Sequence, residues 1–294
     1  MLRAGIVGLP NVGKSTLFNA LTRSHQAAAE NYPFTTIEPN VGVLAVPDPR
    51  LAPLARLAGV ETIVPATVEL VDIAGLVKGA AAGEGLGNRF LAHVREVDAI
   101  VQVVRCFRDP DVVHVEADLR PVADIVTIAT ELLLADLESA SRQKERLEKA
   151  AKSGDRALRA QVELAARLVA HLDAGSPALA FEATPEERDA LRGFFLLTAK
   201  PTLYACNVAE EELAGADENP LVREVRAWAE THAAAEATVI SAKIESELAD
   251  LAPEEAAEYL AALGVAESGV AELIRRIHHL LGLATFFTMN EKEV

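Results

Sequence analysis

The sequence predicts an α/β fold, in which a mostly parallel β-sheet has helices on both faces and carries an inserted α-helical hairpin. Short runs rich in β-branched residues alternate with helical stretches, as expected when helices connect parallel strands. The strand-like runs are residues 4–7, 67–71, 99–104, 202–206 and 237–240. From about residue 124 to residue 172, apolar residues instead recur at spacings of three, four or seven, which is typical of packed helices and predicts the hairpin.

The inserted segment is expected to form two antiparallel helices of the coiled-coil type. Ser153, Gly154 and Asp155 offer a turn between them. Between Arg142 and Arg159, seven cations outnumber three acids, so the tip of the hairpin is net positive. The cations are Arg142, Lys144, Arg146, Lys149, Lys152, Arg156 and Arg159. A charge run of this kind is usually a solvated helix face, and the alternative interpretation is a contact to RNA.

The composition indicates a globular protein with a sizeable core, since half of the 294 residues are hydrophobic and 24% are charged. The formal net charge of −16 argues against non-specific nucleic-acid binding over the whole surface, and we expect no DNA partner. No apolar run reaches the roughly 20 residues of a membrane span, and no signal peptide is evident. We therefore expect a cytoplasmic protein without a membrane partner. Cys106 and Cys206 lie in strand-like runs and are expected to be free, buried thiols.

A phosphate-binding loop follows the first strand. Residues 8–15, Gly-Leu-Pro-Asn-Val-Gly-Lys-Ser, match the pattern G-x-x-x-x-G-K-[ST] and open a helical stretch. The main chain of such a loop points its N–H groups at the phosphates, next to the positive end of the helix. We assign nucleotide binding to Asn11, Val12, Gly13, Lys14, Ser15 and Thr16. Lys14 neutralises β- and γ-phosphate oxygens and is a catalytic candidate, while the Ser15 hydroxyl is expected to ligate Mg²⁺. The fold is therefore predicted to be that of a G-protein-like P-loop NTPase.

Asn11 has two interpretations. Its side chain favours a turn, which is the preferred interpretation. Alternatively, its amide helps to hold a monovalent cation such as K⁺ beside the phosphates.

A second carboxylate motif follows a later strand. Asp72 ends the strand-like run and is followed by Ile-Ala-Gly75, so it lies where open α/β sheets bind their ligands and can hold the magnesium shell. The N–H of Gly75 can sense the γ-phosphate, which makes Gly75 a switch residue. The next residue is Leu76, where Ras-like switches carry the glutamine that positions the attacking water. Leucine cannot position water, so turnover is expected to be slow or to depend on another group; we class Leu76 with the switch residues.

Two further segments are candidates for parts of this chemistry. His114 follows a strand on a polar loop and can supply the missing catalytic group, although a lone histidine is more often a surface or packing residue. Thr35 and Thr36 lie between prolines, and one hydroxyl of such a pair can ligate Mg²⁺ when the triphosphate is bound. We assign the metal contact to Thr36 and a switch role to Thr35.

The base-recognition motif differs from that of GTP-binding proteins. They use Asn-Lys-x-Asp, where the aspartate accepts two hydrogen bonds from guanine, whereas this chain has Asn207-Val208-Ala209-Glu210. Asn207 can still bond a purine, and Val208 would place an apolar side chain against the ring edge. Losing the lysine and lengthening the acid removes the fit to guanine, so we expect ATP. Ser241, Ala242 and Lys243 follow a strand and are expected to lie along the base.

Together these motifs resemble the YchF, or Obg-like ATPase, family over essentially the whole chain. The residues that carry the resemblance are 8–16, 32–40, 72–78, 83–88, 207–210 and 241–243. The resemblance implies an ATP-preferring relative of the translation-factor G proteins that associates with ribosomes. It also implies a hydrophobic residue in place of the catalytic glutamine, matching Leu76, and a loop histidine implicated in hydrolysis, matching His114. Finally, it implies a small C-terminal β-grasp (TGS) domain, of which only the opening is present.

On this basis we expect four segments. Residues 1–123 and 199–282 form the two parts of the nucleotide-binding domain, residues 124–198 form the inserted hairpin, and residues 283–294 begin the truncated TGS domain. The predicted function is that of a slow ATPase switch that binds the ribosome and modulates translation or a stress response. Three alternatives remain: an Obg-type GTPase, a nucleotide-gated binding module with negligible hydrolysis, and a kinase, for which no acceptor site is evident.

Overall fold

The computed structural model describes residues 2–24, 40–74, 86–109, 119–152, 155–232, 235–290 and 292–294. Its strands are β1 (Arg3–Val7), β2 (Val41–Ala45), β3 (Thr67–Asp72), β4 (Ala99–Arg105), β5 (Thr202–Asn207) and β6 (Ala235–Ile240). Its α-helices are α1 (Lys14–Ser24), α3 (Leu51–Ala58), α4 (Leu86–Arg95), α5 (Pro121–Ala151), α6 (Arg156–Asp173), α7 (Pro185–Arg192), α8 (Pro220–Glu230), α9 (Ala242–Leu248), α10 (Pro253–Ala262) and α11 (Gly269–Leu280).

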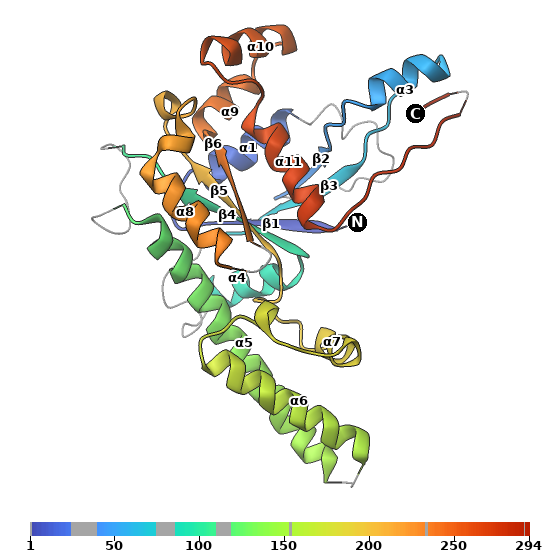
Figure 1. The fold of residues 1–294 in the computed structure, drawn as a ribbon, viewed down its shortest axis with the longest axis vertical. Coiled ribbons are helices and arrows are strands. Elements are labelled where there is room, and N and C mark those ends of the chain that lie inside the picture. The colour runs from blue at the N-terminus through green and yellow to red at the C-terminus, as the bar shows by residue number, and fades with distance from the viewer. Residues whose placement is uncertain are drawn as a thin grey trace.

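The six strands form one sheet in the order β2-β3-β1-β4-β5-β6 (Figure 1). All neighbours pair in parallel except β2, which runs antiparallel to β3 at one edge. Every residue of β4 is buried, as expected for an inner strand covered on both faces, and its sequence is almost continuously apolar. The predicted fold class is therefore confirmed, whereas β2 was not predicted.

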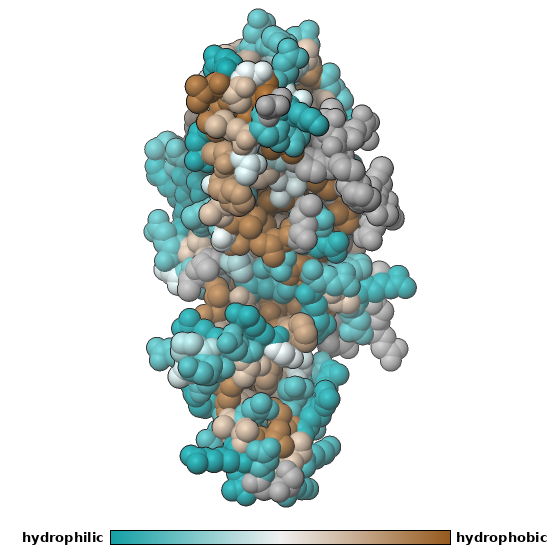
Figure 2. Space-filling model, turned by 90° about the vertical axis from the view of Figure 1, so that its right-hand side faces the viewer, coloured by the Kyte–Doolittle hydropathy of each residue, from teal (hydrophilic) through white to brown (hydrophobic). Residues whose placement is uncertain are grey.

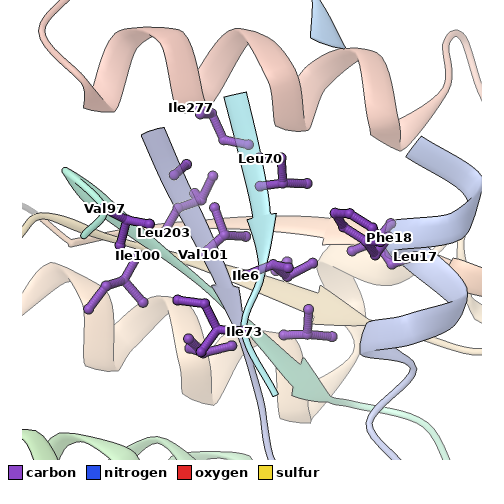
Figure 3. Close-up of a cluster of buried hydrophobic side chains, with 14 of the residues drawn as sticks. Ile6, Leu17, Phe18, Leu70, Ile73, Val97, Ile100, Val101, Leu203 and Ile277 are labelled. Atoms are coloured by element: carbon purple, nitrogen blue, oxygen red, sulfur yellow. The ribbon is translucent and has the colours of Figure 1, made fainter. Parts of the chain in front are cut away.

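Helices cover both faces of the sheet because successive side chains of a strand point to opposite sides. On β5, Leu203 and Ala205 belong to the cluster that contains Ile277 of α11. The alternate residues, Tyr204 and Cys206, belong to a second cluster with α8. Figure 3 shows the first cluster, in which Ile277 points from α11 toward the strands. The apolar stripe of α11, which the sequence suggested would close the sheet, is buried there.

The hairpin consists of α5 and α6, which pack along each other and extend away from the sheet (Figure 1). Its hydrophobic seam includes Ala140, Leu168 and Leu172, all buried. Figure 2 shows hydrophilic side chains on both sides of this part of the molecule, with hydrophobic side chains between them. Asp155 caps the first turn of α6 by accepting a hydrogen bond from the N–H of Ala157 at 2.7 Å. The two helices therefore pack through an apolar seam and leave their charged faces to solvent.

A buried aspartate fastens the hairpin to the segment that leads into β5. Asp136 of α5 is 1% exposed. Its carboxylate accepts hydrogen bonds from the N–H of Leu197 at 2.8 Å, the N–H of Thr198 at 2.8 Å and the hydroxyl of Thr198 at 2.6 Å. Since a buried carboxylate is costly without partners, these bonds stabilise a single arrangement at the root of the hairpin.

The C-terminal segment returns to the β2 edge of the molecule. Val294 is buried against Leu51 and Ala55 of α3, and its backbone bonds that of Thr62 and Val64. Within the described part of the chain, no helix is both long enough and apolar enough to cross a membrane.

Candidate nucleotide site

The predicted site residues that the structure describes come together at the carboxyl edge of the sheet. In parallel strands these ends lie side by side, and ligands of open α/β sheets bind there. β1 leads into the loop 8–13, β3 ends at Asp72, β5 ends at Asn207, and β6 leads to Ser241. Helix α1, which follows the loop, packs against α9, which begins at Ala242. The chain thus brings together four segments that are widely separated in sequence.

The loop conformation explains its two motif glycines. A Cβ at Gly8 would lie 3.1 Å from the carbonyl oxygen of Val103 in β4. Gly13 has φ +91°, and a Cβ there would collide with Nδ2 of Asn207. Asn11 has φ 63°, a left-handed conformation that asparagine tolerates better than most residues, as its interpretation as a turn residue requires. The tight curl of the backbone therefore depends on these residues.

Lys14 and Asp72 form an ion pair across the site. The Nζ atom of Lys14 contacts Oδ1 of Asp72, and the two side chains are only 10% and 19% exposed. The two motifs that were assigned to the phosphates and to the metal are therefore within direct reach of each other.

Asn207 braces the phosphate loop, a role that the sequence did not indicate. Its Nδ2 donates to the carbonyl of Val12 at 2.9 Å, and its Oδ1 accepts from the N–H of Ala242 at 2.9 Å. The residue is 3% exposed. One amide group thus joins the phosphate loop, the end of β5 and the start of α9, because an asparagine side chain both donates and accepts.

The remaining base-site candidates divide into buried and exposed residues. Val208 is 2% exposed and lies in the cluster with α8. Its side chain is in the core, which contradicts the expectation that it lies against a ring edge. Ser241 and Ala242 are buried, while Lys243 is exposed and forms an ion pair with Glu210 at 2.9 Å. Only part of this group can therefore offer side chains to a base.

Ser15 and Thr16 are exposed at the start of α1, where a ligand can reach them. The candidates Thr35, Thr36, Gly75, Leu76 and His114 lie outside the described residues.

Arg105 was not identified from the sequence, since it belongs to no motif. The residue is 3% exposed at the end of β4. Its guanidinium donates to the carbonyls of Phe107 at 3.2 Å and Asp109 at 3.3 Å and lies 4.6 Å from the centre of the Phe107 ring. Arg105 therefore orders the beginning of the segment that continues toward His114.

The oxygen donors suit Mg²⁺. Magnesium is usually held by one or two protein oxygens together with phosphates and water, and not by a complete protein cage. The Ser15 hydroxyl and the Asp72 carboxylate are such oxygens, both accessible at the same edge. Within the described ranges, no group of three or more His, Cys, Asp or Glu side chains could hold a metal ion by itself. A hydrogen bond with Cys206 and burial raise the pKa of the Cys106 thiol, so it stays protonated and is no candidate ligand.

Comparison with known proteins gives a consistent result. A family model described as "50S ribosome-binding GTPase" matches residues 3–157. The "Ribosome-binding ATPase YchF" of Bacillus subtilis (strain 168) is 48% identical over 293 residues, covering 100% of this chain and 80% of that protein. The protein of the same name from Escherichia coli O157:H7 is 45% identical over 292 residues, covering 99% and 79%. The structure described as the Schizosaccharomyces pombe YchF GTPase has a TM-score of 0.87 and 35% identity, covering 99% of this chain and 79% of that one.

Proposed function

Because this chain belongs to the YchF family, we propose that it is a ribosome-associated switch that binds ATP with Mg²⁺ and hydrolyses it slowly. The observation that carries the proposal is the joint placement of Lys14, Asp72 and Asn207 around an intact phosphate loop. Its relatives are named ATPase or GTPase, so the base must be argued from this chain. Glu210 replaces the aspartate that guanine requires, and it is held by Lys243, which favours ATP.

Each part of the site has its own proposed role in binding Mg-ATP. The amides of the loop and the Lys14 ammonium bind the β- and γ-phosphates, and Asn207 keeps the loop in its curled form. Ser15, Asp72 and Thr36 are the residues that would hold Mg²⁺. When bound, Mg²⁺ neutralises charge on the β- and γ-phosphate oxygens. Ligand binding requires Lys14 and Asp72 to exchange their mutual contact for contacts with the phosphates and the metal shell.

Hydrolysis is proposed to depend on His114, because Leu76 has no polar group with which to position water. Turnover of the isolated protein is expected on the order of 10⁻³ to 10⁻² per second, as for unassisted switches. Thr35 and Gly75 would respond to the γ-phosphate, and Asn11 would support the loop or a K⁺ ion beside it.

A phosphate-release assay combined with nucleotide competition tests the enzymatic part. ATP is expected to displace a fluorescent nucleotide better than GTP, and His114→Ala is expected to slow phosphate release without weakening ATP binding. A clear preference for GTP would favour an Obg-type GTPase instead. Equal partner affinity in the ATP and ADP states would speak against a nucleotide-gated switch.

The ribosome is the proposed partner, and the hairpin tip is the proposed contact with ribosomal RNA, which places the protein in the cytoplasm. Arg142 and Lys144 are already paired with Glu138 and Glu148 on the same helix. Arg146 donates a hydrogen bond to Oε1 of Gln143 at 3.4 Å. The other four tip cations are exposed and form no ion pair within the described part of the chain: Lys149, Lys152, Arg156 and Arg159. These four have their full charge available for phosphate.

Ribosome co-sedimentation over a range of salt concentrations tests this contact. Changing these four cations to glutamine is expected to weaken ribosome binding and to reduce its salt dependence. The slope of the logarithm of the binding constant against the logarithm of the salt concentration should become less steep by about 0.7–0.9 for each phosphate that is no longer neutralised. Changing Arg142 and Lys144 to glutamine is the matched control on the same hairpin and is expected to have a smaller effect. An unchanged slope in the fourfold variant would exclude the tip as the RNA contact.

A further inference from the structure

A four-residue polar cluster surrounds the position that would recognise a guanine base. Glu210 opens a 3₁₀ turn, Glu210–Glu212, shortly after β5. Lys243 and Glu247 come from α9, and Tyr259 comes from α10, which lies beyond α9 in Figure 1. Three separate elements therefore meet at Glu210.

Both carboxylate oxygens of Glu210 are engaged. Oε2 accepts from the Lys243 ammonium at 2.9 Å, and Oε1 lies 3.2 Å from the Tyr259 hydroxyl. The same hydroxyl lies 2.9 Å from Oε2 of Glu247. A tyrosine hydroxyl has one proton, so Tyr259 donates to either carboxylate at any moment and bridges the two acids.

The charge states at neutral pH support this arrangement. The hydrogen bond with Lys243 lowers the pKa of Glu210, and the hydrogen bond with Glu210 raises the pKa of Lys243. The hydrogen bond with Glu247, together with burial, raises the pKa of Tyr259 to about 12. Glu210 is therefore an anion, Lys243 a cation and Tyr259 a neutral donor.

Guanine differs from adenine in what it demands of an acidic side chain. Guanine presents two donors, N1–H and the 2-amino group, and a carboxylate binds it by offering one free oxygen to each. Lys243 and Tyr259 compete with guanine for the two Glu210 oxygens, because Oε2 accepts from the Lys243 ammonium and Oε1 accepts from the Tyr259 hydroxyl whenever its proton turns toward Glu210. A guanine base would therefore have to displace these contacts to pair both of its donors, whereas adenine lacks both donors and would not.

We infer that Lys243 and Tyr259 are specificity-determining positioning residues, which hold Glu210 away from the base and so disfavour nucleotides with a guanine base. This deepens the proposed function and rests on it. In this role the two residues act through Glu210.

The test uses the whole chain with Lys243→Met, Tyr259→Phe and the double variant. Affinities for ATP, GTP and ITP are measured by competition against a fluorescent nucleotide. The double variant is expected to lower the GTP-to-ATP ratio of dissociation constants by about tenfold, since each bond to a charged group contributes more than a neutral one. In the single variant Tyr259→Phe, which lies outside every segment assigned to the nucleotide, ATP affinity should change less than about twofold. ITP should gain less than GTP, because hypoxanthine has N1–H but no 2-amino group.

Glu210→Ala, added to the double variant, provides the decisive control. If the released carboxylate causes the gain in GTP affinity, this added change must abolish the gain. If the site has only loosened in general, the gain would persist. Glu211→Gln, on the same turn, is the control for charge and should leave the ratio unchanged. The conservative Tyr259→Phe variant keeps the aromatic ring, so a change in its affinities can be attributed to the lost hydroxyl and not to a folding defect.

The two proposals fail in different ways. If the parent prefers ATP but the ratio is unchanged in the double variant, the positioning role is wrong and the proposed function stands. If the parent itself prefers GTP with Glu210 intact, both are wrong.

Discussion

Lys14 and Asp72 contact each other directly, although 58 positions separate them in the sequence. The lysine belongs to the phosphate loop and the aspartate to the end of β3, and parallel pairing of β1 with β3 brings the two ends together. Both side chains are largely screened from water, which strengthens their mutual attraction. A magnesium triphosphate that offers Lys14 anions and Asp72 a cation can replace this pair without leaving either charge uncompensated.

Lys14→Ala should therefore abolish useful binding of Mg-ATP. The variant loses the charge-assisted bonds to the phosphates and leaves Asp72 to repel them. We expect affinity to fall at least about a hundredfold, which corresponds to about 3 kcal/mol. Isothermal titration calorimetry measures the effect, and undiminished affinity would remove the basis for the nucleotide site.

Asp72→Asn should act mainly through the metal. The amide retains the size of the side chain but loses the charge that attracts Mg²⁺ and the ion pair with Lys14. The gain in ATP affinity on adding Mg²⁺ is expected to shrink, while metal-free ADP binds as well as before or more tightly, since Lys14 is released. Titrations with Mg²⁺ and with EDTA distinguish this from a general loss of binding, in which both affinities would fall together.

Gly13→Ala should destabilise the protein and disrupt the phosphate loop. The left-handed backbone costs about 1 kcal/mol for alanine, and the added methyl group would collide with Asn207. Gly59→Ala is a matched control, because Gly59 has φ +71° but nothing within 4 Å of the new methyl group. Thermal unfolding should show a loss in both variants, whereas ATP affinity should fall only in Gly13→Ala. If Gly13→Ala and Gly59→Ala bound ATP equally well, the close approach of Gly13 to Asn207 would not be needed for ATP binding.

Asn207→Ala should weaken ATP binding by releasing the brace. It leaves the Val12 carbonyl and the Ala242 N–H without their buried partner, at a cost of about 1–3 kcal/mol. Asn219→Ala removes a comparable bond, that of the α8 cap to the N–H of Leu221 at 2.9 Å, outside the loop. Asn219→Ala should lose stability but retain its affinity for ATP. If Asn207→Ala also retained its ATP affinity, the proposed support of the phosphate loop by Asn207 would be wrong.

Asp136→Asn tests the attachment of the hairpin through its pH dependence. Burial raises the pKa of Asp136 above its ordinary 3.8, although Thr198 and Leu197 partly offset the shift. A raised pKa in the folded state means that the contribution to stability is complete below pH 3.8 and declines as the pH rises through the raised value. The unfolding free energy of the parent relative to Asp136→Asn should therefore decrease from acidic toward neutral pH. A difference that grows with pH would mean that the three hydrogen bonds outweigh burial.

Local patterns were sufficient to predict much of this molecule. The loop 8–15, the strand ending at Asp72 and the two hairpin helices each carry their information in consecutive residues, so periodicity and motif spacing identify them. β2 was not predicted because it is a five-residue edge strand, Val41–Ala45, that contains a glycine and lacks a clear alternation of apolar and polar residues. The roles of Thr36, Leu76 and His114 remain predictions.

The features that were missed depend on contacts between distant residues. The predicted contact of Asn207 with a base stays a prediction, but the sequence did not reveal that its amide joins Val12 and Ala242. Val208 was predicted to lie against a base, but its side chain packs in the core after the end of β5. Tyr259 has no motif at all, and only the packing of α10 brings it to Glu210. Such relationships arise from the tertiary arrangement and leave no periodic signal in the chain.

The brace made by Asn207 has a consequence for synthesis of the protein. The phosphate loop is translated near the start of the chain, but its support lies 195 positions later, and the partner of that support a further 35 positions on. A nascent chain that has exposed only its first half therefore has the loop without the amide that stabilises its curvature. Tight retention of ATP should begin only after α9 has left the exit tunnel, so nucleotide capture would report that synthesis has passed β6 and α9.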